Sequence, residues 1–359
     1  MIVTRTALPR GRVSGIRAIG ASRISRYHPY STKTDDGDFN VSTPPSPLMS
    51  VGELKSEVEK KRIYFYALPL TTKKTFLHCK YRNEIFPGGK ETLENKLIGK
   101  FVNVWKKFSE SDNKINTTIV GFIDKVLSRI PWLETCLLSI PSQKFITRKL
   151  RADSEADTKF VTHTEILEKN LSSKDLEDFD FYYPKGLTDV ETMLETFRPE
   201  FRAQYEMHRK GIFTDLMLLP LTIPVALVPL VPNVPGFYLL YRVYCHIKVI
   251  ASLKFLVTLL KELHFKFHKV DGVREIYLKT ADQEIQANVL EQMAYVENEM
   301  EFTEAETARE EKLLISEDVV EELCRVLDDE QCAEKLRFAI RQELQNMRKH
   351  DEELDSRDN

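Results

Sequence analysis

Apolar residues recur every three or four positions through much of residues 51–211, the spacing of amphipathic helices. Thr188 and Glu191 have the spacing of a capping box, which predicts a helix start, while Pro199 and Gly211 predict a kink and an end. We therefore expect a soluble helical region over residues 51–211. Residues 62–79, rich in aromatic side chains, are the best candidate for a strand. Two of the apolar stripes are Leu97, Phe101, Val104, Trp105 and Phe108, and Ile119, Ile123, Val126, Leu127 and Ile130.

An uncharged stretch of 26 residues, Leu216–Tyr241, interrupts this pattern. It is long enough to cross about 30 Å of hydrocarbon, so residues 212–241 are predicted to be a proline-rich transmembrane segment. A short hairpin that turns at residues 232–236, and a buried hairpin in a soluble core, are the alternatives. Interior prolines remove helical hydrogen bonds, and neighbouring helices are expected to satisfy the freed carbonyls. The residues expected to shape this segment for a partner are Pro220, Pro224, Pro229, Pro232, Asn233, Pro235 and Gly236.

Residues 242–270 remain apolar but carry basic side chains. Lys248 and Lys254 would each cost about 3 kcal/mol near the centre of a span. We therefore interpret the stretch as a basic amphipathic helix lying on anionic lipid, with the side that follows the span in the matrix. The expected membrane-interface anchors are Tyr238, Tyr241, Arg242, His246 and Lys248.

The C-terminal region, residues 271–359, is acidic: it carries 11 Lys and Arg against 26 Asp and Glu, whereas residues 1–270 carry 41 against 29. No general basic character therefore suggests nucleic-acid binding. Apolar stripes over residues 319–327 and 336–347 predict a helical hairpin or coiled coil for self-association or partner binding. The acidic residues that join them, Asp328, Asp329 and Glu330, lack the central glycine and ligand spacing of a calcium loop.

The N-terminus, residues 1–31, is rich in arginine and serine and free of acidic residues, as in mitochondrial transit peptides. A polar, proline-rich linker is expected over residues 32–50. Five scattered cysteines without a CxxC pair are expected to be free thiols in a reducing compartment.

No catalytic constellation, nucleotide loop or metal motif occurs in the sequence, so we expect neither an enzyme nor a cofactor. His264 and His268 would share one face of a helix, but no HExxH accompanies them, and a basic interfacial helix explains them better than a metal site does. The expected fold is mostly α.

The segments "IYFYALPLT", "LSRIPWLETCLLSIP" and "LMLLPLTIPVALVPLVPNVPGFYLLYRVYCH" resemble the mitochondrial potassium–proton exchange-related proteins, grouped with the LETM-type cation-homeostasis system. The resemblance covers residues 62–270. It implies an inner-membrane protein that contributes to potassium/proton exchange within a larger complex, in contact with lipid and other inner-membrane proteins. It supplies no catalytic residue. The alternative is a structural, assembly or tethering protein whose effect on ion exchange is indirect.

Overall fold

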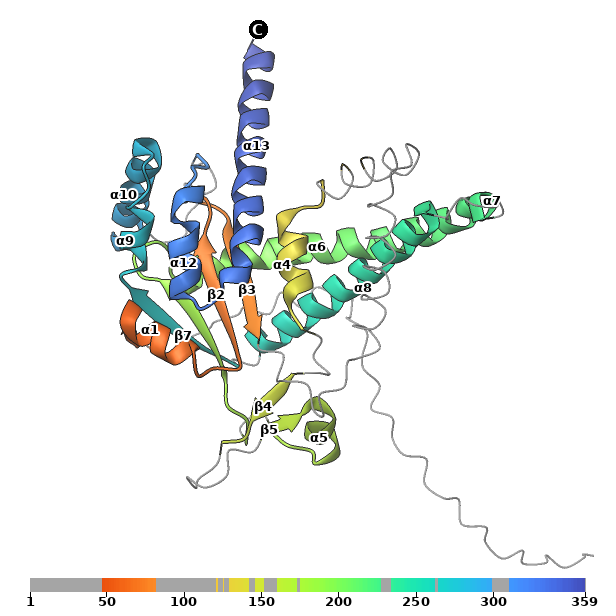
Figure 1. Cartoon of the computed structure of the whole chain (residues 1–359), viewed down its shortest axis with the longest axis horizontal. Coiled ribbons are helices and arrows are strands. Elements are labelled where there is room, and N and C mark those ends of the chain that lie inside the picture. Colours follow the sequence, from red (N-terminus) through yellow and green to blue (C-terminus); the bar gives the residue numbers. More distant parts are fainter. Residues whose placement is uncertain are drawn as a thin grey trace, which may run out of the picture. The chain divides into compact units, whose positions relative to one another are not determined.

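A five-stranded mixed β-sheet organises the core of this computed structural model (Figure 1). The strand order is β1-β7-β6-β2-β3; β3 is antiparallel to β2, and the other neighbours are parallel. The strands are β1 (Leu48–Ser50), β2 (Ile63–Pro69), β3 (Thr75–Tyr81), β6 (Phe179–Pro184) and β7 (Phe265–Asp271). The structure describes residues 47–81, 121, 125, 129–141, 146–151, 160–172, 175–226, 234–261, 264–298 and 310–358.

The sheet corrects two sequence-based expectations. The region 51–211 is not simply helical, because it supplies β2, β3 and β6, and the expected strand over residues 62–79 is in fact the β2–β3 hairpin. The helix expected over residues 242–270 ends at Lys261, and β7 follows. Phe265 and Phe267 are buried while Lys266 between them is exposed. This two-residue alternation is that of a strand, and the apolar helix before it masks the change of period.

Phenylalanines line one face of the sheet. Phe65 packs edge-on against Phe265, with ring centroids 5.0 Å apart, and Phe179 packs in the same way against Phe255 of the long helix α8, at 6.2 Å. Tyrosines line the opposite face, where Tyr64 donates a hydrogen bond to the Leu327 carbonyl. Because neighbouring residues of a strand point to opposite faces, the repeated aromatic residues of β2, β6 and β7 place a helical layer on each side.

Two long helices, α6 (Val190–Leu218) and α8 (Val234–Lys261), pack against each other and extend away from the sheet (Figure 1). The N-cap of α6 is Asp189, which accepts a hydrogen bond from the Thr192 N–H, one residue later than the capping box predicted. The helix continues through Pro199 and Gly211, so the predicted end at Gly211 was wrong.

The proline-rich segment is not one continuous helix. Its described residues lie in the end of α6, a 3₁₀ turn η4 (Leu219–Thr222), the short α7 (Ile223–Ala226) and the start of α8. Of the alternative turn at residues 232–236, the described residues 234–236 belong to α8. Pro220, Pro224 and Pro235 each lie in the first turn of one of these elements. Pro235 lies at the start of α8, where a missing N–H has no helical acceptor, whereas Pro220 and Pro224 follow α6 and η4 without a gap in the helical backbone.

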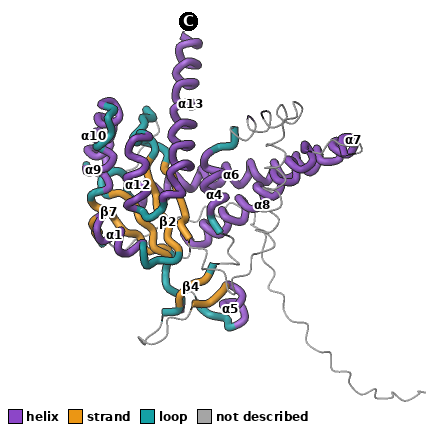
Figure 2. The backbone as a smooth tube through the Cα atoms, viewed as in Figure 1, coloured by secondary structure: helices purple, strands orange, loops and turns teal. Residues whose placement is uncertain are grey.

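The C-terminal region is helical, as expected, and its last helix leads away from the sheet (Figure 2). The predicted pair of helices exists as α12 (Val320–Val326) and α13 (Ala333–Asp358), whereas its self-association remains a prediction. All five cysteines are buried and free, as expected, whereas the reducing compartment remains a prediction. The transit peptide, the linker before Pro47, and the stripes that contain Trp105 and Ile119 lie outside the described residues.

The remaining elements are α1 (Val51–Val58), α4 (Trp132–Ser139), β4 (Thr147–Lys149), β5 (Phe160–Thr162), α5 (His163–Glu168), α9 (Val273–Tyr277), α10 (Gln283–Glu297), η5 (Glu317–Val319) and η6 (Glu330–Cys332).

Candidate functional site: an apolar hairpin and a buried charged cluster

Exposed large hydrophobic side chains are concentrated on the distal part of the α6–α8 pair. We call this part, residues 207–226 and 234–247, the apolar hairpin. It holds eleven of the fourteen such side chains in the described part of the chain. Scattered apolar residues are normal on a protein surface, but a contiguous group marks a membrane or protein interaction site. The eleven are Met207, Phe213, Leu216, Met217, Leu218, Leu221, Ile223, Phe237, Leu240, Tyr241 and Ile247.

Within the described residues, one helix, Pro235–Lys261, is long and apolar enough to cross a membrane. However, 44% of its most apolar window is buried inside the protein. Val249, Leu253 and Leu256 in its second half belong to the core beside the sheet. Only the first half, on the apolar hairpin, therefore exposes apolar surface to a membrane.

Charged side chains are buried where α4 meets the two long helices. Glu134 of α4 is fully buried, and both its oxygens accept hydrogen bonds from the Arg242 guanidinium of α8, one of them over 3.1 Å. Such a two-point pairing satisfies charges that would be costly to bury alone. We use the term charged cluster for Glu134, Arg242 and three neighbours, His208, Asp215 and His246.

The two histidines of the charged cluster are hydrogen-bonded to each other. Their Nδ1 atoms lie 2.6 Å apart, so one donates and the other accepts. Beyond them, His246 Nε2 lies 3.3 Å from Asp215 Oδ2, and His208 Nε2 lies 3.2 Å from Gln204 Oε1. Burial lowers the pKa of His208 to about 4, so this ring is neutral at physiological pH.

Gly211 makes room for this arrangement. A Cβ atom there would lie 2.5 Å from His246 Nε2, closer than non-bonded atoms approach. The sequence suggested a helix end at this glycine; its role is instead a close contact between α6 and α8.

Replacing Gly211 with alanine is expected to lower the free energy of unfolding. Overpacking of this kind costs about 1–3 kcal/mol, which exceeds the gain of about 1 kcal/mol in helix propensity. Gly52→Ala is the matched control, because no heavy atom lies within 4 Å of a Cβ at that helical glycine. Chemical denaturation of the detergent-solubilised chain should show a loss for the first variant and none for the second. Equal stability of the two variants would contradict the close contact.

Glu200 lies one turn before Gln204 on α6, and its carboxyl group has a raised pKa. Burial raises its pKa to about 7, against the opposing effect of Lys74, while Glu343 and Glu311 raise it further. Its Oε2 atom is buried and has no hydrogen-bond partner. These contacts come from the β2–β3 turn and from the C-terminal region, so Glu200 reports on the packing of both against α6.

We expect Glu200→Gln to be more stable than the natural chain at pH 8 and to lose this advantage near pH 5. Between the ordinary carboxyl pKa of 4.5 and about 7, the folded chain holds a proton that the unfolded chain releases. The free energy of unfolding of the natural chain therefore falls by about 1–3 kcal/mol as pH rises through this window. Glutamine does not ionise, so the variant should not show this decrease. Thermal unfolding from pH 5 to pH 8 measures it, with Glu206→Gln, exposed on the same helix, as control. Parallel pH profiles for the natural chain and Glu200→Gln would show that Glu200 ionises normally.

The residues expected at a membrane interface separate into two groups. Tyr241 is exposed on the apolar hairpin, and Tyr238 and Lys248 are half-buried, the ammonium of Lys248 lying 5.9 Å from the centre of the Tyr244 ring. Arg242 and His246 instead point into the charged cluster. Of the residues expected to shape the segment, Pro229, Pro232 and Asn233 lie outside the described residues, Pro220, Pro224 and Pro235 are exposed, and Gly236 is buried.

Sequence reasoning missed Glu134, His208 and Asp215. One signal was available for Glu134, which is the one acidic residue in an otherwise apolar segment between Pro131 and Pro141. The ion pair between Glu134 and Arg242 could not be predicted from the sequence, because the two residues are 108 positions apart along the chain.

Comparison with known proteins agrees with the resemblance seen in the sequence. Residues 64–260, more than half of the chain, match the family described as mitochondrial K+-H+ exchange-related. The chain belongs to this family. The matched region includes β2, the apolar hairpin and the whole charged cluster, and it ends at the last turn of α8.

Relatives of this mitochondrial family member occur in two yeasts. An uncharacterized protein of Saccharomyces cerevisiae is 29% identical over 225 residues, which are 62% of this chain and 70% of the relative. An uncharacterized protein of Schizosaccharomyces pombe is 30% identical over 186 residues, 52% of this chain and 70% of the relative. No solved structure matches.

Proposed function

We propose that this chain is an accessory subunit of a potassium/proton exchange system of the mitochondrial inner membrane, and that it is neither an enzyme nor an exchanger by itself. The observation that carries the proposal is the gathering of exposed apolar side chains on the apolar hairpin. Membership of a mitochondrial K+-H+ exchange-related family supports the ion-exchange role.

The apolar hairpin enters the membrane from one side. Residues 216–226 of its first arm measure about 17 Å at 1.5 Å per residue, roughly half the thickness of the hydrocarbon core. The base of the second arm is held in the core beside the sheet, so both arms return to the same side. With a transit peptide at the N-terminus and a positive charge excess after the apolar segment, that side is the matrix.

An accessory role fits the chemistry of the hairpin better than a pore does. Proteins that move protons or cations carry ionisable groups within their spans, yet residues 216–241 contain none of Asp, Glu, Lys, Arg or His. The ion path is therefore supplied by partner subunits. The charged cluster flanks this uncharged stretch, with Asp215 directly before it and Arg242 directly after it.

Swelling of isolated mitochondria in potassium acetate tests the proposal. Mitochondria that lack the chain should swell more slowly than normal ones, while mitochondrial protein synthesis measured in parallel stays unchanged. Normal swelling would overturn the ion-exchange role. Slower swelling together with a fall in protein synthesis would instead favour a structural, assembly or tethering protein with an indirect effect.

A further inference from the structure

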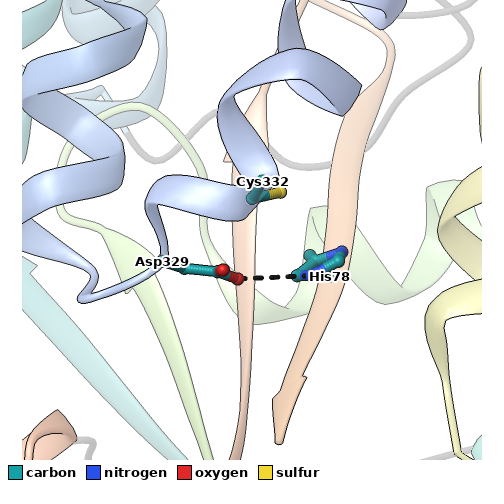
Figure 3. Close-up of side chains that lie close together, drawn as sticks. All are labelled: His78, Asp329 and Cys332. Carbon is teal, nitrogen blue, oxygen red and sulfur yellow. Dashed lines mark ion pairs between the residues drawn. The ribbon is translucent and has the colours of Figure 1, made fainter.

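Three buried side chains of metal-binding type meet beside the edge strand of the sheet (Figure 3). His78 lies on β3, whereas Asp329 and Cys332 lie in the turn that leads through η6 into α13. One ligand atom from each, an imidazole nitrogen, a carboxylate oxygen and the Cys332 sulfur, lie within 4.8 Å of one another. All three side chains are at most 5% exposed.

The hydrogen bonds around His78 determine which ring nitrogen carries hydrogen. Ser139 Oγ donates its single hydrogen to the Cys136 carbonyl, at 2.6 Å. His78 Nδ1, 3.2 Å from the same Oγ, must therefore donate to it. In a neutral ring Nε2 is then a bare acceptor, yet it faces Asp329 Oδ2 at 3.3 Å. Two acceptors at this distance need a proton or a metal cation between them.

The surroundings give the ring little access to solvent, since His78 is 5% exposed, and the Lys80 ammonium already pairs with the Asp329 carboxylate at 3.1 Å. A metal cation fits better. Neutral imidazole, carboxylate and thiolate are ligands of zinc, and a ring N–H held by a second group is the usual support of a metal-bound histidine.

The carboxylate is already oriented for this role. Tyr66 Oη donates to Asp329 Oδ2 over 3.1 Å, and Lys80 Nζ donates to Oδ1, also over 3.1 Å. Lys80 leaves lone pairs of both oxygens available, and its charge balances the carboxylate when no metal is bound.

We propose that His78, Asp329 and Cys332 form a structural site for one divalent cation of the zinc class. On binding, the Cys332 thiol releases its proton to solvent and the thiolate sulfur bonds to the metal, so the dication and its two anionic ligands sum to zero charge. A water molecule or the Tyr66 hydroxyl takes the fourth position that zinc prefers. The site fastens the start of α13 to β3 and is independent of the role in ion exchange.

The test is the metal content of the full chain, purified in mild detergent without chelator and measured by plasma mass spectrometry. We expect about one zinc per chain, and at least about tenfold less in Cys332→Ser and in His78→Gln, because each loses one of three ligands. Cys324→Ser is the matched control: this cysteine is also buried and free, on the neighbouring α12, but is not among the three ligands. It should retain zinc.

Cobalt keeps the test decisive if a variant fails to fold. The natural chain, stripped of metal and then titrated with Co²⁺, should develop the absorption of a thiolate–cobalt bond at one equivalent, and so should Cys324→Ser. A natural chain that holds no zinc and develops no such absorption overturns the site. Zinc retained in full by Cys332→Ser places the metal elsewhere and overturns the assignment too.

Discussion

Replacing Leu221 and Ile223 with arginine is expected to release the protein from the membrane. Both side chains are more than half exposed, at the end of the described first arm. Each arginine costs about 3 kcal/mol when placed in hydrocarbon, so the pair opposes insertion by about 6 kcal/mol. Alkaline carbonate extraction of mitochondria should leave the natural chain in the pellet and the double variant in the supernatant.

The matched control carries the same two charges elsewhere. Leu167 on α5 and Leu290 on α10 are also more than half exposed, but they lie outside the apolar hairpin. Leu167→Arg with Leu290→Arg should therefore remain in the pellet. Retention of the hairpin variant in the pellet, or release of the natural chain, would show that the hairpin does not hold the protein in the membrane.

Replacing Glu134 with alanine is expected to destabilise the fold by about 3–5 kcal/mol. The substitution leaves the Arg242 guanidinium, whose side chain is only 13% exposed, without its carboxylate. The loss also removes the anion that His208 Nε2 faces at 4.0 Å. Denaturant unfolding of the detergent-solubilised chain, followed by tryptophan fluorescence, measures the change.

A double variant separates charge from packing. Glu134→Leu with Arg242→Leu removes both charges, and such neutral replacements of buried pairs are often harmless. The double variant should recover most of the lost stability. A single Glu134→Ala variant within 1 kcal/mol of the natural chain would mean that the pair contributes little, and the charged cluster would then not be what joins α4 to the long helices.

The sequence could predict elements whose signals are local. The 3.6-residue spacing of apolar residues predicted α12 and α13, and the run of aromatic residues predicted a strand near residue 64. β6 and β7 were missed because each is a short aromatic run that becomes a strand only by pairing with a partner far along the chain: Phe181 lies opposite Phe65 and Phe267. The two-residue alternation of β7 is short and follows an apolar helix closely, and every residue of β6 is buried, so neither run shows a clear strand period.

The candidate site shows the same limit more sharply. The uncharged stretch over residues 216–241 indicated the apolar hairpin, whereas the partner expected to pack against its prolines remains a prediction. The charged cluster could not be predicted from the sequence, because Arg242 and His246 have the pattern of membrane-interface anchors when α8 is considered alone. They become interior residues only because α4 and α6 bring Glu134, His208 and Asp215 to the same place.

Whether the apolar hairpin serves ion exchange is tested most directly by potassium-acetate swelling of mitochondria whose only copy of the chain carries Leu221→Arg and Ile223→Arg. Import and steady-state amount should be matched to mitochondria that carry the Leu167→Arg, Leu290→Arg control. We expect the hairpin variant to swell as slowly as mitochondria without the chain, and the control to swell at the normal rate. Normal swelling with the hairpin variant would contradict a role for the hairpin in potassium/proton exchange.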